Sequence, residues 1–76
     1  MEELIRYIVK PLVNAPDKIV ITLGEERNGM TVYNLLVDEA DKGFVIGKQG
    51  RVAKAIRSIV RTAAMKENKK VHVDIL

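Results

Sequence analysis

The sequence predicts an α+β fold, a two-layer sandwich in which three helices cover one face of a three-stranded mixed sheet. Two observations support this prediction. Apolar residues recur at helical spacing in residues 2–10 and 51–65. Residues 18–23, 30–37 and 71–76 are instead rich in β-branched residues that alternate with polar ones. The expected order of elements is therefore α-β-β-α-α-β.

The first predicted helix spans residues 2–10, where apolar residues recur every three or four positions. Glu2 and Glu3 lie in its first turn, where the helix dipole favours negative charge. Pro11 disfavours helical geometry at Lys10, so the helix should end or re-initiate there.

Two strands are predicted next, over residues 18–23 and 30–37, and both contain many β-branched residues. The segment between them, residues 24–29, is charged and bounded by glycines. Such a segment between two strand-like runs is typical of a β-hairpin, so we expect the two strands to pair.

A short helix is predicted after the hairpin. Asp38, followed by Asp41 three positions later, resembles a capping box in which the shorter acid replaces Glu. The helix should therefore begin near Glu39. It must be short, because Gly43 and Gly47 follow closely.

A long helix and a final strand complete the prediction. After Gly50, apolar residues recur at helical spacing, and no Gly or Pro interrupts them before Asn68. Residues 71–76 then alternate as a strand. The residues of this strand expected to face the core are Val71, Val73 and Ile75.

Composition limits the chain to one small domain. Its 76 residues, 47% hydrophobic and 30% charged, suffice for one folded unit, so we expect a single domain over residues 1–76. The absence of cysteine excludes disulfides and thiolate zinc sites and favours a reducing setting. No apolar run exceeds three residues, so we expect no membrane span and no signal peptide, and a cytoplasmic protein.

The segment with the most suggestive chemistry is Gly47-Lys48-Gln49-Gly50, between the two later helices. Two glycines so close together let the backbone turn sharply and leave no Cβ to obstruct a sugar-phosphate chain. The loop leads into a helix N-terminus, whose unpaired N–H groups attract phosphate, and Lys48 and Arg51 add positive charge. Two glycines at this spacing also arise by chance, so the loop alone is weak evidence.

Basic residues continue from the loop along the long helix. Their spacing of three, three and four residues places them in one stripe beside the apolar face: Arg51, Lys54, Arg57 and Arg61. An isolated stripe is more often only the solvated side of an amphipathic helix. A stripe that begins at a phosphate-competent loop favours a surface that binds a polyanion.

Residues 45–56, Val-Ile-Gly-Lys-Gln-Gly-Arg-Val-Ala-Lys-Ala-Ile, resemble the signature of the KH-domain family. In that signature two aliphatic residues precede a G-x-x-G loop, and aliphatic positions recur along the next helix. The order of elements over the whole chain resembles the bacterial type II arrangement. With Asp41-Lys-Gly43 ahead of the loop, the chain is similar to the small bacterial single-domain KH proteins of the KhpA family. Phe44, where an aliphatic residue is usual, is a minor departure.

The resemblance implies a non-enzymatic protein that binds single-stranded RNA, about four nucleotides at a time, as an RNA chaperone or post-transcriptional regulator. It also implies that Gly47 and Gly50 allow close approach of the RNA backbone while Lys48 and Gln49 face the phosphates. The further nucleic-acid-binding residues would be Arg51, Lys54 and Arg57. Candidates to line an apolar groove under the bases are Ile46, Val52, Leu35 and Val37, and the sequence does not decide which of them belong to the core instead.

We also expect the protein to associate with a second chain. A domain that covers about four nucleotides binds weakly, and a second simultaneous contact raises avidity by about 10²–10⁴. The resemblance implies a homodimer or a heterodimer with a larger KH-containing protein. Two alternatives stay open, an adaptor that binds an acidic protein and a ribosome-assembly factor. We expect no cofactor, no metal, no membrane and no small-molecule substrate.

The sequence provides little support for catalysis. His72, the only histidine, is followed two positions later by Asp74, which could suggest a catalytic or metal site. Without a matching Ser nucleophile or a second imidazole, we interpret His72 as a surface residue of the last strand. The glycine loop also lacks the wider G-x-x-x-x-G-K-[ST] pattern of a P-loop. We therefore predict no catalytic residues.

The formal net charge of +3 conceals a strong asymmetry. Residues 1–41 carry four basic and eight acidic residues, a net charge of −4. Residues 42–76 carry nine basic and two acidic residues, a net charge of +7. If the fold brings the positive segments onto one face, the charge predicts where a polyanion would bind.

Overall fold

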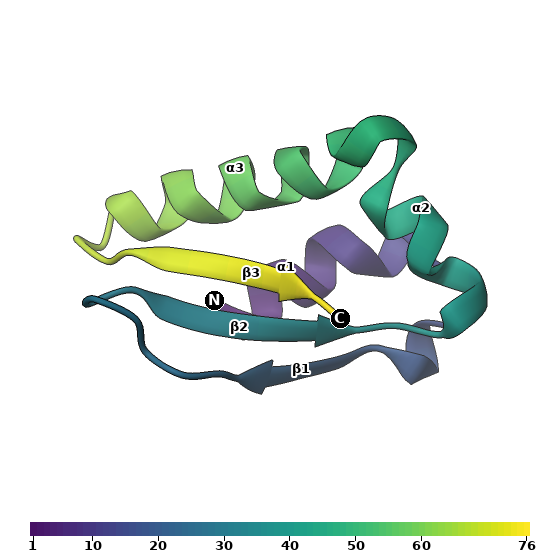
Figure 1. Ribbon diagram of the computed structural model, residues 1–76, viewed down its shortest axis with the longest axis horizontal. Coiled ribbons are helices and arrows are strands. Elements are labelled where there is room, and N and C mark those ends of the chain that lie inside the picture. The colour runs from purple at the N-terminus through teal and green to yellow at the C-terminus, as the bar shows by residue number, and fades with distance from the viewer.

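The computed structural model describes residues 1–76, and its elements follow the predicted order (Figure 1). The helices are α1 (Glu2–Val9), α2 (Lys42–Ile46) and α3 (Arg51–Met65). The strands are β1 (Val20–Leu23), β2 (Thr31–Leu36) and β3 (Val71–Ile75). Short 3₁₀ turns lie at Lys10–Leu12, Pro16–Lys18, Glu39–Asp41 and Lys48–Gly50.

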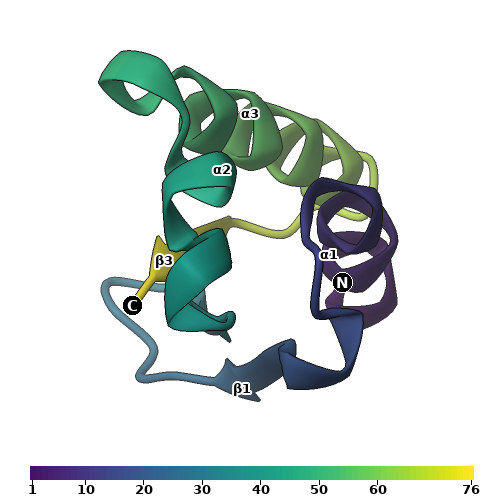
Figure 2. The ribbon, with the colours of Figure 1, turned by 90° about the vertical axis from the view of Figure 1, so that its right-hand side faces the viewer.

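The three strands form one mixed sheet in the order β1-β2-β3. β1 pairs with β2 antiparallel, as the hairpin predicts, and Ile21 lies opposite Leu35. β2 pairs with β3 parallel, and Leu35 lies opposite Ile75. All three helices lie on one face of this sheet (Figure 2), so the predicted α+β sandwich is confirmed. The order leaves β1 and β3 as the two edges of the sheet.

One core joins the helices to the inner face of the sheet. Its fully buried side chains come from every layer and include Ile5, Val9, Leu35, Val45, Ile56, Val60 and Val73. Burial of each such aliphatic side chain contributes about 1.5–3 kcal/mol, so this packing fixes α3 against β3. Of the predicted inward residues of β3, Val71 and Val73 are buried and Ile75 is half-buried. No helix combines the length and the apolar composition that crossing a membrane requires.

The predicted capping box at Asp38 and Asp41 is wrong. Asp38 makes no side-chain cap hydrogen bond, and Asp41 is only 1% exposed. The Oδ2 atom of Asp41 instead accepts a 3.0 Å hydrogen bond from the backbone N–H of Ala15. The Asp side chain is one methylene shorter than the Glu of a capping box, and the segment after α1 offers it a backbone donor. Residues 39–41 therefore form a 3₁₀ turn, and α2 begins at Lys42.

The first strand is shorter than predicted. Pro16–Lys18 forms a 3₁₀ turn, and the strand pairs with β2 only from Val20 onward. Proline suits the first position of such a turn because its φ is already fixed near the helical value. The turn connects α1 to the edge of the sheet.

Candidate nucleic-acid interface

The loop between α2 and α3 depends on two glycines for different reasons. Gly47 has φ 75° and ψ 172°, a combination that is essentially restricted to glycine, and Gly50 has φ 74° and ψ 14°. A Cβ added to Gly47 would lie 2.8 Å from the Cβ and 2.9 Å from the backbone N of Val52. A Cβ added to Gly50 would have nothing within 4 Å. Glycine is required at position 47 both by the close approach of Val52 and by the positive φ. At position 50 it is favoured only by the positive φ.

The loop presents uncompensated positive charge to solvent. Lys48, Gln49 and Arg51 are all exposed. The only hydrogen bond between these side chains is a long one, 3.4 Å from Arg51 Nη2 to Gln49 Oε1. None of the ion pairs in the structure includes Lys48 or Arg51. Both cations are therefore available to an anion.

The backbone amides of the loop are partly occupied. The N–H of Gly50 donates to the carbonyl of Gly47 at 3.1 Å, and the N–H of Arg51 donates to the carbonyl of Lys48. Gly50 is the N-cap residue of α3, and no side chain caps the helix there. The attraction for phosphate expected at this point thus comes from the exposed cations and the positive end of the α3 dipole more than from these two amides.

The basic stripe lies on the flank of α3 that faces the free edge of β3. Lys54 and Arg61 are exposed, and Arg57 between them is half-buried. The Nε of Arg57 donates a 2.9 Å hydrogen bond to the carbonyl oxygen of Val73 in β3. We call this surface, made of Lys54, Arg57 and Arg61, the basic flank. The basic flank extends from the glycine loop along α3 toward the turn between α3 and β3.

The four candidate groove residues divide into two pairs. Leu35 and Val37 are 0% and 6% exposed and belong to the core. Ile46 and Val52 are half-buried and lie on either side of the glycine loop, Ile46 directly before it and Val52 in the first turn of α3. Only this second pair presents apolar surface that a base could reach.

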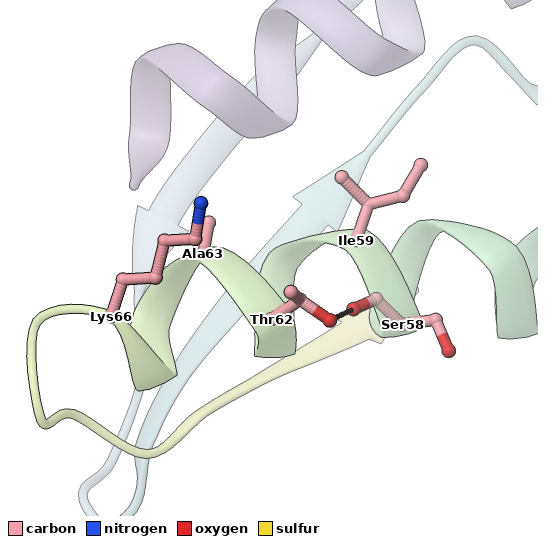
Figure 3. Close-up of a pocket in the computed structure, with 5 residues that line it drawn as sticks. All are labelled: Ser58, Ile59, Thr62, Ala63 and Lys66. Atoms are coloured by element: carbon pink, nitrogen blue, oxygen red, sulfur yellow. Dashed lines mark hydrogen bonds between the residues drawn. The ribbon is translucent and has the colours of Figure 1, made fainter.

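The opposite flank of α3 has a different character. A shallow depression of about 390 Å³ lies there, lined by Ser58, Ile59, Thr62, Ala63 and Lys66. Figure 3 shows Ile59, Ala63 and Lys66 pointing toward α1 and away from β3. Ile59 is 49% exposed, and Lys66 is the single cation. The two flanks of the helix therefore differ in both charge and polarity.

A second depression, of about 420 Å³, lies where the basic flank ends. It is lined by Met30, Arg61, Met65, Lys69, Lys70 and Val71. The fold thus brings the cations of the α3–β3 turn beside the basic flank, as the charge asymmetry of the sequence predicted. The two methionines could not be predicted as part of one surface, because their positions lie 35 residues apart in the sequence with no pattern that connects them.

His72 lies in a small ion-pair cluster on the outer side of β3. Its Nε2 is 2.9 Å from Oδ1 of Asp74, and Oδ2 of the same carboxylate is 3.3 Å from Nη2 of Arg27. No group of three or more His, Cys, Asp or Glu side chains is arranged to hold a metal ion. The Arg27 contact was not predicted, because it depends on how the hairpin folds over the sheet.

Comparison with known proteins decides the family. The family model for the KH domain of KhpA and KhpB matches residues 2–75. The chain belongs to this KhpA/KhpB family.

Full-length relatives of this KhpA/KhpB-family chain agree with the assignment. The RNA-binding protein KhpA of Listeria monocytogenes is 51% identical over 76 residues, which cover 100% of this chain and 99% of the relative. KhpA of Clostridium perfringens is 50% identical over 78 residues, with 100% of both chains covered. KhpA of Bacillus subtilis is 47% identical over 75 residues, covering 99% of this chain and 91% of the relative.

Solved structures agree on the fold. A crystal structure of Aquifex aeolicus Era bound to GDP and AlF4⁻ superposes with a TM-score of 0.73 at 21% identity. A crystal structure of Era with a nucleotide analogue and a segment of 16S ribosomal RNA superposes with a TM-score of 0.69 at 24% identity. Each match covers 96% of this KhpA/KhpB-family chain and 28% of Era. At this level of identity the likeness concerns the fold alone.

Proposed function

We propose that this KhpA/KhpB-family chain binds single-stranded RNA, with about four nucleotides held between the Gly47–Gly50 loop and the basic flank. One observation carries the proposal. A loop with two positive-φ glycines and two exposed, unpaired cations leads directly into the helix flank that bears Lys54, Arg57 and Arg61. The relatives from Listeria monocytogenes and Clostridium perfringens are named RNA-binding protein KhpA, which supports RNA as the class of ligand.

Each residue has a distinct part in the proposed grip. Gly47 keeps the loop close to α3. Gly50 precedes the first residue of α3 and has no side chain that would obstruct the RNA strand. Lys48, Gln49 and Arg51 bind the first phosphates. Lys54 and Arg57 bind those that follow, and the bond from Arg57 Nε to Val73 leaves the two Nη atoms to donate to RNA. The bases then lie over Ile46 and Val52.

The proposed biological role is binding without catalysis, as a cytoplasmic RNA chaperone or post-transcriptional regulator. Residues 1–76 form the binding unit. A grip on about four nucleotides is weak, so we propose that the chain acts as a homodimer or as a heterodimer with a larger KH-containing protein. The second site then provides the avidity that one site lacks.

A second candidate function is a protein adaptor. The exposed Ile59, in a depression that contains only one cation, favours a protein contact on the flank opposite the basic one. Crosslinking to total cellular RNA at physiological salt separates the two candidates. Recovery of RNA supports the RNA-binding proposal, and recovery of none favours the adaptor.

The loop itself is tested with two double variants of equal charge change. Lys48→Asp with Gln49→Asp alters the loop, whereas Lys10→Asp with Asn14→Asp makes the same charge change at exposed residues of the segment after α1, outside the loop and the basic flank. Far-UV circular dichroism establishes that both variants fold. We expect the loop variant to lose at least about tenfold in RNA affinity at fixed salt and the control to lose much less. Equal losses in the two variants would show that net charge, not the loop, governs binding.

A further inference from the structure

The depression at the end of the basic flank combines an apolar floor with a cationic rim. Val71, 7% exposed, forms part of the floor, and Met30 and Met65 are 36% and 66% exposed. Arg61, Lys69 and Lys70 complete the lining, which contains no carboxylate. Lys69 has one acidic neighbour outside the depression, Glu67 at 3.8 Å, in a largely exposed pair. Such weak surface pairing leaves the positive charge largely uncompensated.

Both methionines are held on well-defined backbone. Met30 and Arg27 exchange two backbone hydrogen bonds of 2.8 Å across the tip of the hairpin. Met65 is the last residue of α3, and the N–H of Lys69 returns to the carbonyl of Ala64 at 2.9 Å. The carbonyl of Lys70 then accepts from the N–H of Thr31 at 2.9 Å. The two sides of the depression are thus tied to each other and not left to loop motion.

We propose that this depression is a nucleotide subsite that takes one more base of the same RNA strand, beyond those held near the glycine loop. A polarisable thioether makes favourable contacts with an aromatic ring, and a guanidinium plane such as that of Arg61 can stack on a base. The surrounding cations suit the phosphates on either side of that base. In this proposal the RNA strand runs from the glycine loop, along the basic flank, to Met30 and Met65.

The length of α3 sets the length of RNA that reaches the subsite. Its 15 residues span about 22 Å at about 1.5 Å per residue. A stacked RNA strand advances about 3.4 Å per nucleotide, so roughly six to seven nucleotides cover the distance. A four-nucleotide RNA held at the loop does not fill the depression, whereas an eight-nucleotide RNA does. The inference rests on the proposed RNA-binding function.

The chain offers a direct readout, because it contains only three methionines. Selective methyl labelling gives one NMR signal each for Met1, Met30 and Met65. With a random-sequence eight-nucleotide RNA, we expect shifts of the Met30 and Met65 methyls and of the loop amides, with Met1 unchanged. With a four-nucleotide RNA, only the loop amides should move. Loop shifts without methyl shifts in the longer RNA would overturn the subsite and leave the proposed function intact.

The RNA affinities of methionine variants test the same subsite by a second measurement. Met65→Ala and Met30→Ala should each weaken eight-nucleotide binding by about two- to tenfold and leave four-nucleotide binding unchanged. Tyr7→Ala, which truncates an 80% exposed side chain on α1, is the matched control and should change neither. If the wild-type protein binds both RNAs equally, the subsite does not exist. If neither RNA moves the loop amides, the proposed function fails and the subsite fails with it.

Discussion

The side chain of Arg57 donates a 2.9 Å hydrogen bond from Nε to the carbonyl oxygen of Val73, which links the basic flank of α3 to the edge strand β3. β3 has no further strand beside it, so this carbonyl receives its donor from a side chain. The stripe predicted from the sequence is therefore more than a solvated helix face. Its middle member is positioned by the sheet, and its neighbours Lys54 and Arg61 remain in solvent.

Arg57→Ala should affect both stability and RNA binding. Loss of the bond to Val73 should lower the free energy of unfolding by about 0.5–1.5 kcal/mol, the net value of one hydrogen bond. Loss of one phosphate contact should reduce the slope of log affinity against log salt by about 0.7. Urea denaturation and fluorescence anisotropy across a salt series measure the two effects.

Arg57→Lys is the matched variant, because it keeps the charge and loses the planar guanidinium. We expect it to restore the salt slope while recovering only part of the affinity. If Arg57→Ala leaves the salt slope unchanged, Arg57 does not contact a phosphate, and its role is the structural hydrogen bond to Val73.

Alanine should be tolerated much less well at Gly47 than at Gly50. At Gly47 the new Cβ meets the backbone N of Val52, which a rotamer change cannot move, in a backbone region that costs about 1–3 kcal/mol for other residues. At Gly50 the space is open, and only the left-handed backbone costs about 1–2 kcal/mol. Urea denaturation should rank Gly47→Ala as less stable than Gly50→Ala by at least about 1 kcal/mol.

The double variant Gly47→Ala with Val52→Ala tests whether contact with Val52 causes the loss of stability in Gly47→Ala. Val52→Ala removes the two γ-methyl groups but leaves the Cβ and backbone N, so it should relieve only part of the Gly47→Ala penalty. A strictly additive double variant would mean that the γ-methyl groups of Val52 do not contribute, and that the backbone conformation of Gly47 and the remaining atoms of Val52 set the cost.

Features that depend on near neighbours in sequence were predictable. The length of α3 follows from its apolar periodicity, and the loop follows from glycine chemistry and a helix start, all within residues 47–65. The α+β order could be predicted because each strand and helix carries its own pattern. These signals need no knowledge of what packs against them.

Contacts between distant segments could not be predicted. The local pattern predicts that Asp41 completes a capping box with Asp38, yet its hydrogen-bond donor, Ala15, lies 26 residues away in the sequence. Arg57 and Val73 are 16 residues apart and meet only after β3 docks beside α3. Met30 and Met65 were not predicted to form a surface, because both are exposed only where the hairpin and the helix end.

Asp41→Ala should destabilise the fold more than Asp41→Asn. The Oδ2 atom of Asp41 accepts from the N–H of Ala15, and its buried Oδ1 has no partner. Alanine leaves that N–H without its side-chain acceptor, which costs about 1–3 kcal/mol, whereas Asn keeps an acceptor oxygen in the same place. Thermal and urea unfolding should give clearly different values for the two variants. Equal losses would assign the role of Asp41 to its packing volume and not to the hydrogen bond.

Removal of single cations should map the path of RNA on α3. Lys54→Gln and Arg61→Gln on the basic flank should each lower the salt slope by about 0.7, as expected when one phosphate contact of a single strand is lost. Lys66→Gln removes one positive charge from the opposite flank, just after the end of α3. Figure 3 shows the Lys66 side chain pointing toward α1. If RNA follows the β3 side of the helix, the Lys66 variant keeps the wild-type slope, because its amine does not contact a phosphate. If all three variants shift the slope equally, RNA senses only the overall charge of the helix, and the assignment to the β3 side is wrong.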